Sequence, residues 1–118
     1  MTGEQMIAKA IFLLGYNDMN GNTNDPRFQA TAKNALNFIY SDLFYINRAE
    51  GFKEMEGFSD EIDLSERAIF DVMPYGVAAF IAQAIGDGEN QRYFSQLYNL
   101  KRKVLAEPGT ITDAIPSV

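Results

Sequence analysis

Glycine and proline divide this chain into separate segments, and this division constrains the fold more than any other feature. Helical periodicity is found before Gly15, from Pro26 to just before Gly51, on either side of Pro74, and again after Gly86. Glycine readily adopts the left-handed backbone that ends a helix, and proline fits only a helix's first turn. With 118 residues and 47% hydrophobic side chains, the chain is long enough to bury one core. The pattern therefore predicts an all-α fold, a compact bundle of about four to five helices.

Two helices are predicted in the first half of the chain. Thr2 and Gln5 form a capping box, and apolar residues follow at helical spacing until Gly15, which predicts a helix over residues 2–14. A longer helix is expected over residues 26–49, with proline in its first turn and an apolar stripe facing the core. That stripe comprises Phe28, Ala32, Ala35, Ile39, Leu43 and Ile46, and it is widened by Phe38, Phe44 and Tyr45.

The second half is expected to contain an extended loop and three helices. Residues 52–64 lack helical periodicity and predict an extended loop, with a short pair of strands as the alternative. A short helix over 66–72 is expected to break or kink at Pro74, because proline has no N–H to donate and disfavours helical backbone before it. Further helices are predicted over 74–85 and 89–106. The predicted core includes Ile39, Leu43, Val77, Phe80, Ile81, Leu97 and Leu100, with Tyr93 and Val104 also buried by the last helix.

The chain contains neither cysteine nor histidine. This composition excludes disulfides, thiolate nucleophiles and Cys-based zinc sites, and it removes the commonest general base. Asp60, Glu61 and Asp63 could bind a hard cation or act as an acid–base pair, but no nucleophile or phosphate-binding loop accompanies them. Counted from Asp18, the Asn-rich loop lacks the glycine and the glutamate that a calcium loop requires. We therefore expect no enzyme activity, no catalytic residue, no cofactor and no metal.

The negative charge is concentrated in one segment. Residues 50–71 hold eight acidic and two basic residues, which accounts for the whole net charge of −6. The segment is either a solvated connection or an acidic face that keeps polyanions away. Neither interpretation favours sequence-independent DNA binding, which requires clustered lysine and arginine. The sequence shows no membrane-spanning run and no signal-peptide pattern, so a soluble protein made in the cytoplasm, with no membrane partner, is expected.

Several side chains near the end of the predicted bundle are candidates for contact with a partner. Lys101, Arg102 and Lys103 lie in the last turns of the final helix. They either compensate the helix dipole or contact an acidic surface of another subunit. Tyr75 precedes Gly76 at the start of its helix, where it either closes the core or lies near an interface.

The C-terminal residues differ from the rest of the chain. Residues 1–106 are expected to form a single helical domain, and residues 107–118 an extended tail. Ile111 and Ile115 alternate with polar residues in that tail, between two prolines that prevent a helix. The tail either docks on a neighbouring subunit in extended form or frays as chain ends commonly do.

Three runs of packing residues stand out in the second half of the chain. They are DVMPYGVA at 71–78, IGD at 85–87, and the aromatic residues of 93–98 followed by Lys101 and Arg102. With weaker matches at 42–44 and 64–65, the pattern covers somewhat over half of the chain. In order and spacing these residues resemble the small helical head–tail connector (neck adaptor) proteins of tailed bacteriophages.

This resemblance implies a structural protein of the virion neck, assembled in the host cytoplasm. Such proteins form a homo-oligomeric ring of about twelve copies. The ring joins the portal protein of the DNA-filled head to a downstream neck or tail protein, and genomic DNA passes through its channel without specific binding. On this view the interface residues are Phe52, Phe58, Tyr75, Lys101, Arg102, Lys103, Ile111 and Ile115. The alternative is a small acidic helical phage-encoded regulator or inhibitor that binds a host protein.

Overall fold

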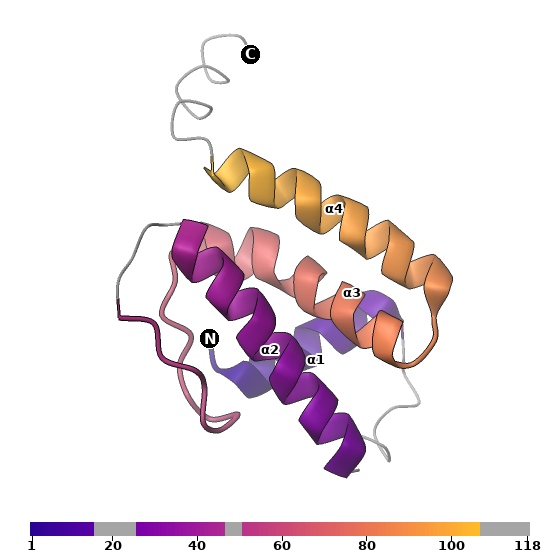
Figure 1. Cartoon of the computed structure of the whole chain (residues 1–118), viewed down its shortest axis with the longest axis horizontal. Coiled ribbons are helices and arrows are strands. Elements are labelled where there is room, and N and C mark those ends of the chain that lie inside the picture. The colour runs from indigo at the N-terminus through magenta and orange to yellow at the C-terminus, as the bar shows by residue number, and fades with distance from the viewer. Residues whose placement is uncertain (16–25, 47–50, 107–118) are drawn as a thin grey trace, which may run out of the picture.

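The computed structural model describes residues 1–15, 26–46 and 51–106. Within these residues the chain is helical and contains no strand, which confirms the predicted all-α fold (Figure 1). An isolated antiparallel bridge joins Thr2 and Glu61. The elements are α1 (Gly3–Leu14), α2 (Pro26–Ile46), the π-helical turn η2 (Ala68–Val72), α3 (Met73–Ala84) and α4 (Gly88–Ala106). The predicted helical residues 47–49 and the tail 107–118 lie outside the described residues.

The first helix begins and ends where its sequence predicts. The Thr2 hydroxyl accepts a hydrogen bond from the Gln5 N–H at 3.2 Å, and the Gln5 side chain accepts one from the Thr2 N–H at 2.9 Å. Gly15 adopts a φ of 77° and donates its N–H to the carbonyls of Ile11 and Phe12. The capping box and the left-handed glycine thus satisfy backbone groups at both ends of α1.

The expectation was a break or a kink at Pro74, and the structure shows that the helix does not break there. Helical backbone continues from Glu66 through Ala84, with residues 68–72 in the π-helical turn. At its end the Met73 N–H donates to the carbonyl of Ala68, five residues back instead of four. Since Pro74 has no N–H to donate, this wider turn changes the hydrogen-bond spacing at the proline without ending the helix.

Helix α3 lies at the centre of the fold and contacts α1, α2 and α4 (Figure 1). Its small side chains are buried, which allows its neighbours to approach closely. At Gly76 the approach is closest: an added Cβ atom would stand 2.7 Å from the Tyr98 ring and 2.9 Å from Ile39. Only glycine fits between α3 and α4 at this point without displacing a neighbour.

The core confirms part of the predicted set. Ile39, Leu43, Val77 and Ile81 are buried among residues of α1, α2, α3 and the loop before η2. Phe80 is only half-buried and contacts the exposed ring of Phe38, with the ring centroids 5.5 Å apart. Phe80 therefore lies at the margin of the core instead of inside it.

Helix α4 presents a different face to the core from the predicted one. The buried side chains are Phe94 and Tyr98, whereas Tyr93 is 58% exposed and Leu100 is 62% exposed. The predicted stripe was Tyr93, Leu97, Leu100 and Val104, of which Leu97 and Val104 are half-buried. Both faces of α4 carry apolar residues at helical spacing, and the space left at Gly76 admits Tyr98. The predicted orientation of this helix was therefore wrong.

Residues 51–64 form the expected extended loop, and the alternative of a strand pair was wrong. Three backbone hydrogen bonds of 2.8–3.1 Å tie the loop to the start of α1, among them one from the Glu4 N–H to the Phe58 carbonyl. The side-chain amide of Asn37 accepts from the Met55 N–H at 2.7 Å and donates to the Met55 carbonyl at 3.3 Å. The Tyr40 hydroxyl accepts from the Asp63 N–H at 2.9 Å. Side chains of α2 thus hold the loop in place.

Candidate interaction surfaces

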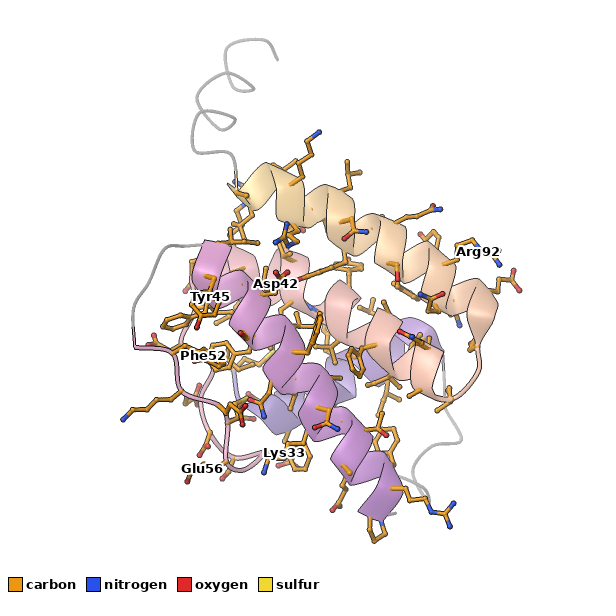
Figure 2. The ribbon with its side chains drawn as sticks, viewed as in Figure 1. Lys33, Asp42, Tyr45, Phe52, Glu56 and Arg92 are labelled. Carbon is orange, nitrogen blue, oxygen red and sulfur yellow. The ribbon has the colours of Figure 1, made fainter. Side chains whose placement is uncertain are left out.

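An open groove of about 820 Å³ lies between the loop and α2, and we call it the acidic groove. Its charged lining is dominated by carboxylates, with two lysines among them. The buried rings of Tyr40 and Phe44 lie at its base. Figure 2 labels two residues that line this groove, Lys33 on α2 and Glu56 in the loop. The charged residues that line it are Glu54, Glu56, Asp60, Glu61, Asp63, Lys33 and Lys53.

Local contacts occupy some of these carboxylates. Asp60 accepts hydrogen bonds from the N–H groups of Glu56 and Gly57 at 3.0 and 3.2 Å. Glu61 forms an ion pair with the amino group of Met1 at 3.0 Å. In the described part of the chain, no three acidic side chains converge to hold a metal ion. The acidic groove therefore offers a negatively charged surface.

An aromatic cluster borders the acidic groove. The half-buried Phe52 packs edge-on against Tyr40 and Phe44, with ring centroids 5.2 and 5.4 Å apart. On its outer side Phe52 meets Tyr45 at 6.2 Å, and Tyr45 is 65% exposed. Figure 2 shows both rings near the C-terminal end of α2. Phe52 thus packs against the domain on one side, and its exposed part can contact a partner.

A second open groove, of about 660 Å³, adjoins this cluster, and we call it the aromatic groove. Four aromatic rings from α2, the loop and α3 line it, and Phe38 among them is 63% exposed. Glu54 lines both grooves, so the two grooves adjoin at this residue. Its lining comprises Phe38, Tyr45, Phe52, Phe80, Asp42, Glu54, Asn34, Asn37 and Ser41.

A polar cluster joins α2 to α4. The Tyr98 hydroxyl donates to Oδ2 of Asp42 at 2.6 Å, and Arg102 donates from Nε and Nη2 to both carboxylate oxygens at 2.6 and 2.9 Å. Burial raises the pKa of Asp42, but the hydrogen bonds from Arg102 and Tyr98 outweigh it, and the pKa lies below its usual value. Burial, followed by the adjacent carboxylate, raises the pKa of Tyr98. The arrangement keeps Asp42 ionised and Tyr98 protonated at neutral pH.

The three basic residues predicted as an interface have different surroundings. Arg102 pairs with Asp42 inside the domain. Lys101 forms an ion pair with Asp71 at 2.9 Å, and its Nζ lies over the Tyr75 ring at 4.9 Å from the centroid. Lys103 is exposed. The structure thus brings Lys101 and Tyr75 together and leaves Lys103 facing solvent.

The predicted interface residues do not form one site. Phe52 and Phe58 lie in the loop, and both are half-buried. The loop and α4 lie on opposite sides of α2 and α3 in Figure 1, so the loop residues are separated from those around Lys101. Ile111 and Ile115 lie outside the described residues.

The sequence analysis assigned no role to Asp42, and the structure shows that this residue joins α2 to α4. A signal was present: Tyr98 and Arg102 stand four residues apart and therefore share one face of α4. An acid beside the apolar stripe of another helix is the partner that such a pair requires.

Comparisons with protein-family models, with curated proteins and with solved structures find no match. None of the helices described for residues 1–106 is long and apolar enough to cross a membrane. The resemblance to head–tail connector proteins therefore stays a prediction.

Proposed function

We propose that this chain is a structural subunit of a homo-oligomeric ring in the neck of a tailed bacteriophage. The ring would join the portal protein to the tail and continue the DNA channel. Its sequence resemblance to head–tail connector proteins suggests this role, and its exposed surface supports it.

The observation that carries the proposal is the number of large apolar side chains that the domain leaves exposed. Seven of them are 48–76% exposed among the described residues, and they lie on α1, α2, η2 and α4 and at the residue that follows α3. Scattered apolar residues are normal on a monomer, but large rings and aliphatic chains on several faces of a small domain favour burial against other subunits. They are Phe12, Phe38, Tyr45, Phe70, Ile85, Tyr93 and Leu100.

The acidic groove supports the same role. Its carboxylates give one side of the domain a negative surface. Facing a channel, that surface would repel the phosphate backbone and let DNA pass without adhering. Facing a neighbouring subunit, it would attract a basic surface.

Coexpression with the portal protein encoded in the same genome tests this proposal. We expect annular particles by negative-stain electron microscopy, bound coaxially to the portal ring. Multi-angle light scattering should give a mass many times the 13.2 kDa of one chain. A protein that stays monomeric at high concentration and does not bind the portal would contradict the proposal.

The acidic groove also keeps the regulator alternative open. A groove with five carboxylates and an aromatic base suits a basic segment of a host protein. That function predicts a one-to-one complex with a single host protein, and the combined substitution Glu54→Lys and Glu56→Lys should abolish it. A one-to-one complex without any ring would favour this alternative.

A further inference from the structure

The outer side of α4 carries an apolar stripe that the described elements cover only in part. We call Tyr93, Leu97, Leu100 and Val104 the outer stripe; their spacing places them along one line of the helix. Tyr93 and Leu100 are 58% and 62% exposed. In Figure 1, α4 forms one edge of the domain, with α3 on its inner side. The helix therefore has two apolar faces: one packs against the core, and the other is partly exposed to solvent.

Unpaired basic residues lie along one side of the outer stripe. Within Gly88–Ala106, four basic residues stand against one acidic residue. Lys101 and Arg102 are engaged inside the domain, whereas Arg92 and Lys103 form no ion pair with any residue that the structure describes. Arg92 and Lys103 are eleven residues apart and so lie on the same side of the stripe. A partner that fits this surface is apolar at its centre and acidic at its rim.

The aromatic groove has those properties. Its exposed rings are Phe38 and Tyr45, at 63% and 65% exposure, and Phe52 lies beside them. Glu54 lines both this groove and the acidic groove, and Glu56 lines the acidic groove. Residues 51–66 hold six acidic residues and one basic residue. In charge and apolar character, this surface complements the outer stripe of α4.

We propose that the outer stripe of α4 docks into the aromatic groove of a second copy of this chain, with Arg92 and Lys103 beside Glu54 and Glu56. The inference rests on the proposed function, because it names the contact between neighbouring subunits of the ring. Apolar contact at the centre and opposite charges at the rim are the usual arrangement of a specific interface.

One chain cannot make this contact with itself. Ser95 and Asn99 of α4 line a small cavity together with Phe38 and Phe80, so this side of α4 faces the aromatic groove of its own chain. Helical spacing places Leu100 on a different side of α4 from these two polar residues. The contact is therefore heterologous: each copy offers its stripe to one neighbour and its groove to another. Repetition forms a ring when the rotation between neighbouring copies closes on itself.

Pairing of two outer stripes is the main alternative for a second copy. It would bring two helices of net positive charge together, and like charges across an interface oppose association. The contact between stripe and groove instead places each unpaired base near an acid. Charge complementarity therefore favours the heterologous arrangement.

Cysteine cross-linking tests the proposed contact directly, because the natural chain has no cysteine. Leu100→Cys marks the stripe and Tyr45→Cys marks the groove; both positions are exposed. Under a short bis-maleimide linker, a chain with both substitutions should give a ladder of dimers, trimers and larger species. A mixture of the two single variants should give dimers and nothing larger, and each single variant alone should stay monomeric on a denaturing gel.

A matched control uses Phe12→Cys with Leu100→Cys, because Phe12 is 76% exposed on α1 and outside both surfaces. If this control cross-links as much as the variant with Tyr45→Cys and Leu100→Cys, the cross-links arise from random collisions, and the inference is overturned. Dimers of Leu100→Cys alone at the level of the mixture would show stripe-to-stripe pairing and also overturn it. If sedimentation shows oligomers but the ladder is absent, the ring uses other surfaces and only this inference falls. If neither oligomers nor cross-links form, the proposed function falls as well.

Charge exchange provides a second measurement. Arg92→Glu with Lys103→Glu should weaken self-association at least about tenfold, as should Glu54→Lys with Glu56→Lys. Combining all four substitutions in one chain restores opposite charges across the contact and should recover most of the lost association. A combined variant no better than either pair would overturn the proposed juxtaposition.

Discussion

Arg102 donates two hydrogen bonds to the carboxylate of Asp42, at 2.6 and 2.9 Å, and thereby ties α4 to α2 across sixty residues of sequence. Figure 2 shows Asp42 directed from α2 toward α4. Because Tyr98 donates to the same carboxylate one turn earlier on α4, the pair sets the rotation of that helix about its axis. With Tyr98 and Arg102 turned inward, Tyr93 and Leu100 of the outer stripe are left exposed to solvent.

The Asp42 cluster should contribute measurably to stability. Asp42→Ala leaves the Tyr98 hydroxyl and the Arg102 guanidinium without their acceptor, and we expect a loss of about 1–3 kcal/mol in the free energy of unfolding. The Asp42 and Arg102 side chains are 28% and 39% exposed, which keeps the effect below that of a fully buried pair. Asp42→Asn, which retains one acceptor oxygen, is the matched control and should lose less. Urea denaturation measures both, and a loss below about 0.5 kcal/mol for Asp42→Ala would contradict the predicted role.

The same carboxyl group predicts a dependence on pH. Its pKa is lower in the folded protein than the unperturbed value of 3.8, so the unfolded chain binds the proton more readily. The stabilisation is therefore complete above the unfolded pKa and is lost as the pH falls below it through the folded pKa. Unfolding free energies of the natural protein and of Asp42→Asn should differ at pH 7 and converge toward pH 2. A difference that stays constant over this range would show that ionisation of Asp42 does not matter.

The closest contact between α3 and α4 predicts the effect of a single methyl group. Gly76→Ala would place its Cβ atom 2.7 Å from the Tyr98 ring, and we expect a loss of about 1–3 kcal/mol from overpacking. Gly88→Ala is the control, because nothing lies within 4 Å of the position of its added Cβ atom. Thermal unfolding of the two variants should show a lower midpoint for Gly76→Ala alone. Equal thermal midpoints for the two variants would mean that α4 shifts away from α3 to admit the methyl group without a loss of stability.

Two leucines of identical chemistry test the orientation of α4. Leu43 is fully buried, and Leu43→Ala should cost about 2–5 kcal/mol through lost contacts and a residual cavity. Leu100 is 62% exposed, and in the isolated subunit Leu100→Ala should cost less than about 0.5 kcal/mol. Denaturant titration at low protein concentration, where subunits are separate, provides the comparison. Similar losses of unfolding free energy for the two variants would show that Leu100 is buried, as the sequence pattern predicts.

The isolated protein should not bind duplex DNA in a salt-dependent manner. Two of the three clustered basic residues, Lys101 and Arg102, already pair with Asp71 and Asp42, which leaves few cations to replace phosphate counterions. Fluorescence anisotropy with a labelled duplex at low and moderate salt measures this. Binding that falls steeply with salt and is weakened by Lys103→Ala would overturn the prediction.

Local signals predicted the helices well. The capping box of Thr2 and Gln5 and the glycine at position 15 define α1 through contacts within a few residues, so pattern and structure agree there. Pro74 shows the limit of such reasoning, because proline's missing N–H predicts a break only if the helix keeps its usual spacing. The π-helical turn that avoids the break depends on tertiary packing, and no local pattern indicates it.

The candidate surfaces were less predictable because they depend on which face of each helix is buried. On α4, two apolar faces satisfy the same helical spacing, and the space at Gly76 admits Tyr98 into the core. The sequence pattern predicted the other face, and so it placed the outer stripe inside. The grooves could not be predicted either, because their lining combines residues of α2 with residues of the following loop and α3.

The two hydrogen bonds between Asn37 and Met55 determine the register of an otherwise irregular loop. Like a neighbouring strand, one amide side chain offers both an acceptor and a donor to the backbone of a single residue. Met55 is flanked by Glu54 and Glu56, so a slip of one residue would direct a carboxylate into the core in place of the thioether. Burying an unpaired charge costs far more than burying a methionine, so the slipped register is strongly disfavoured. A single asparagine on α2 thus determines that this loop turns its charges outward.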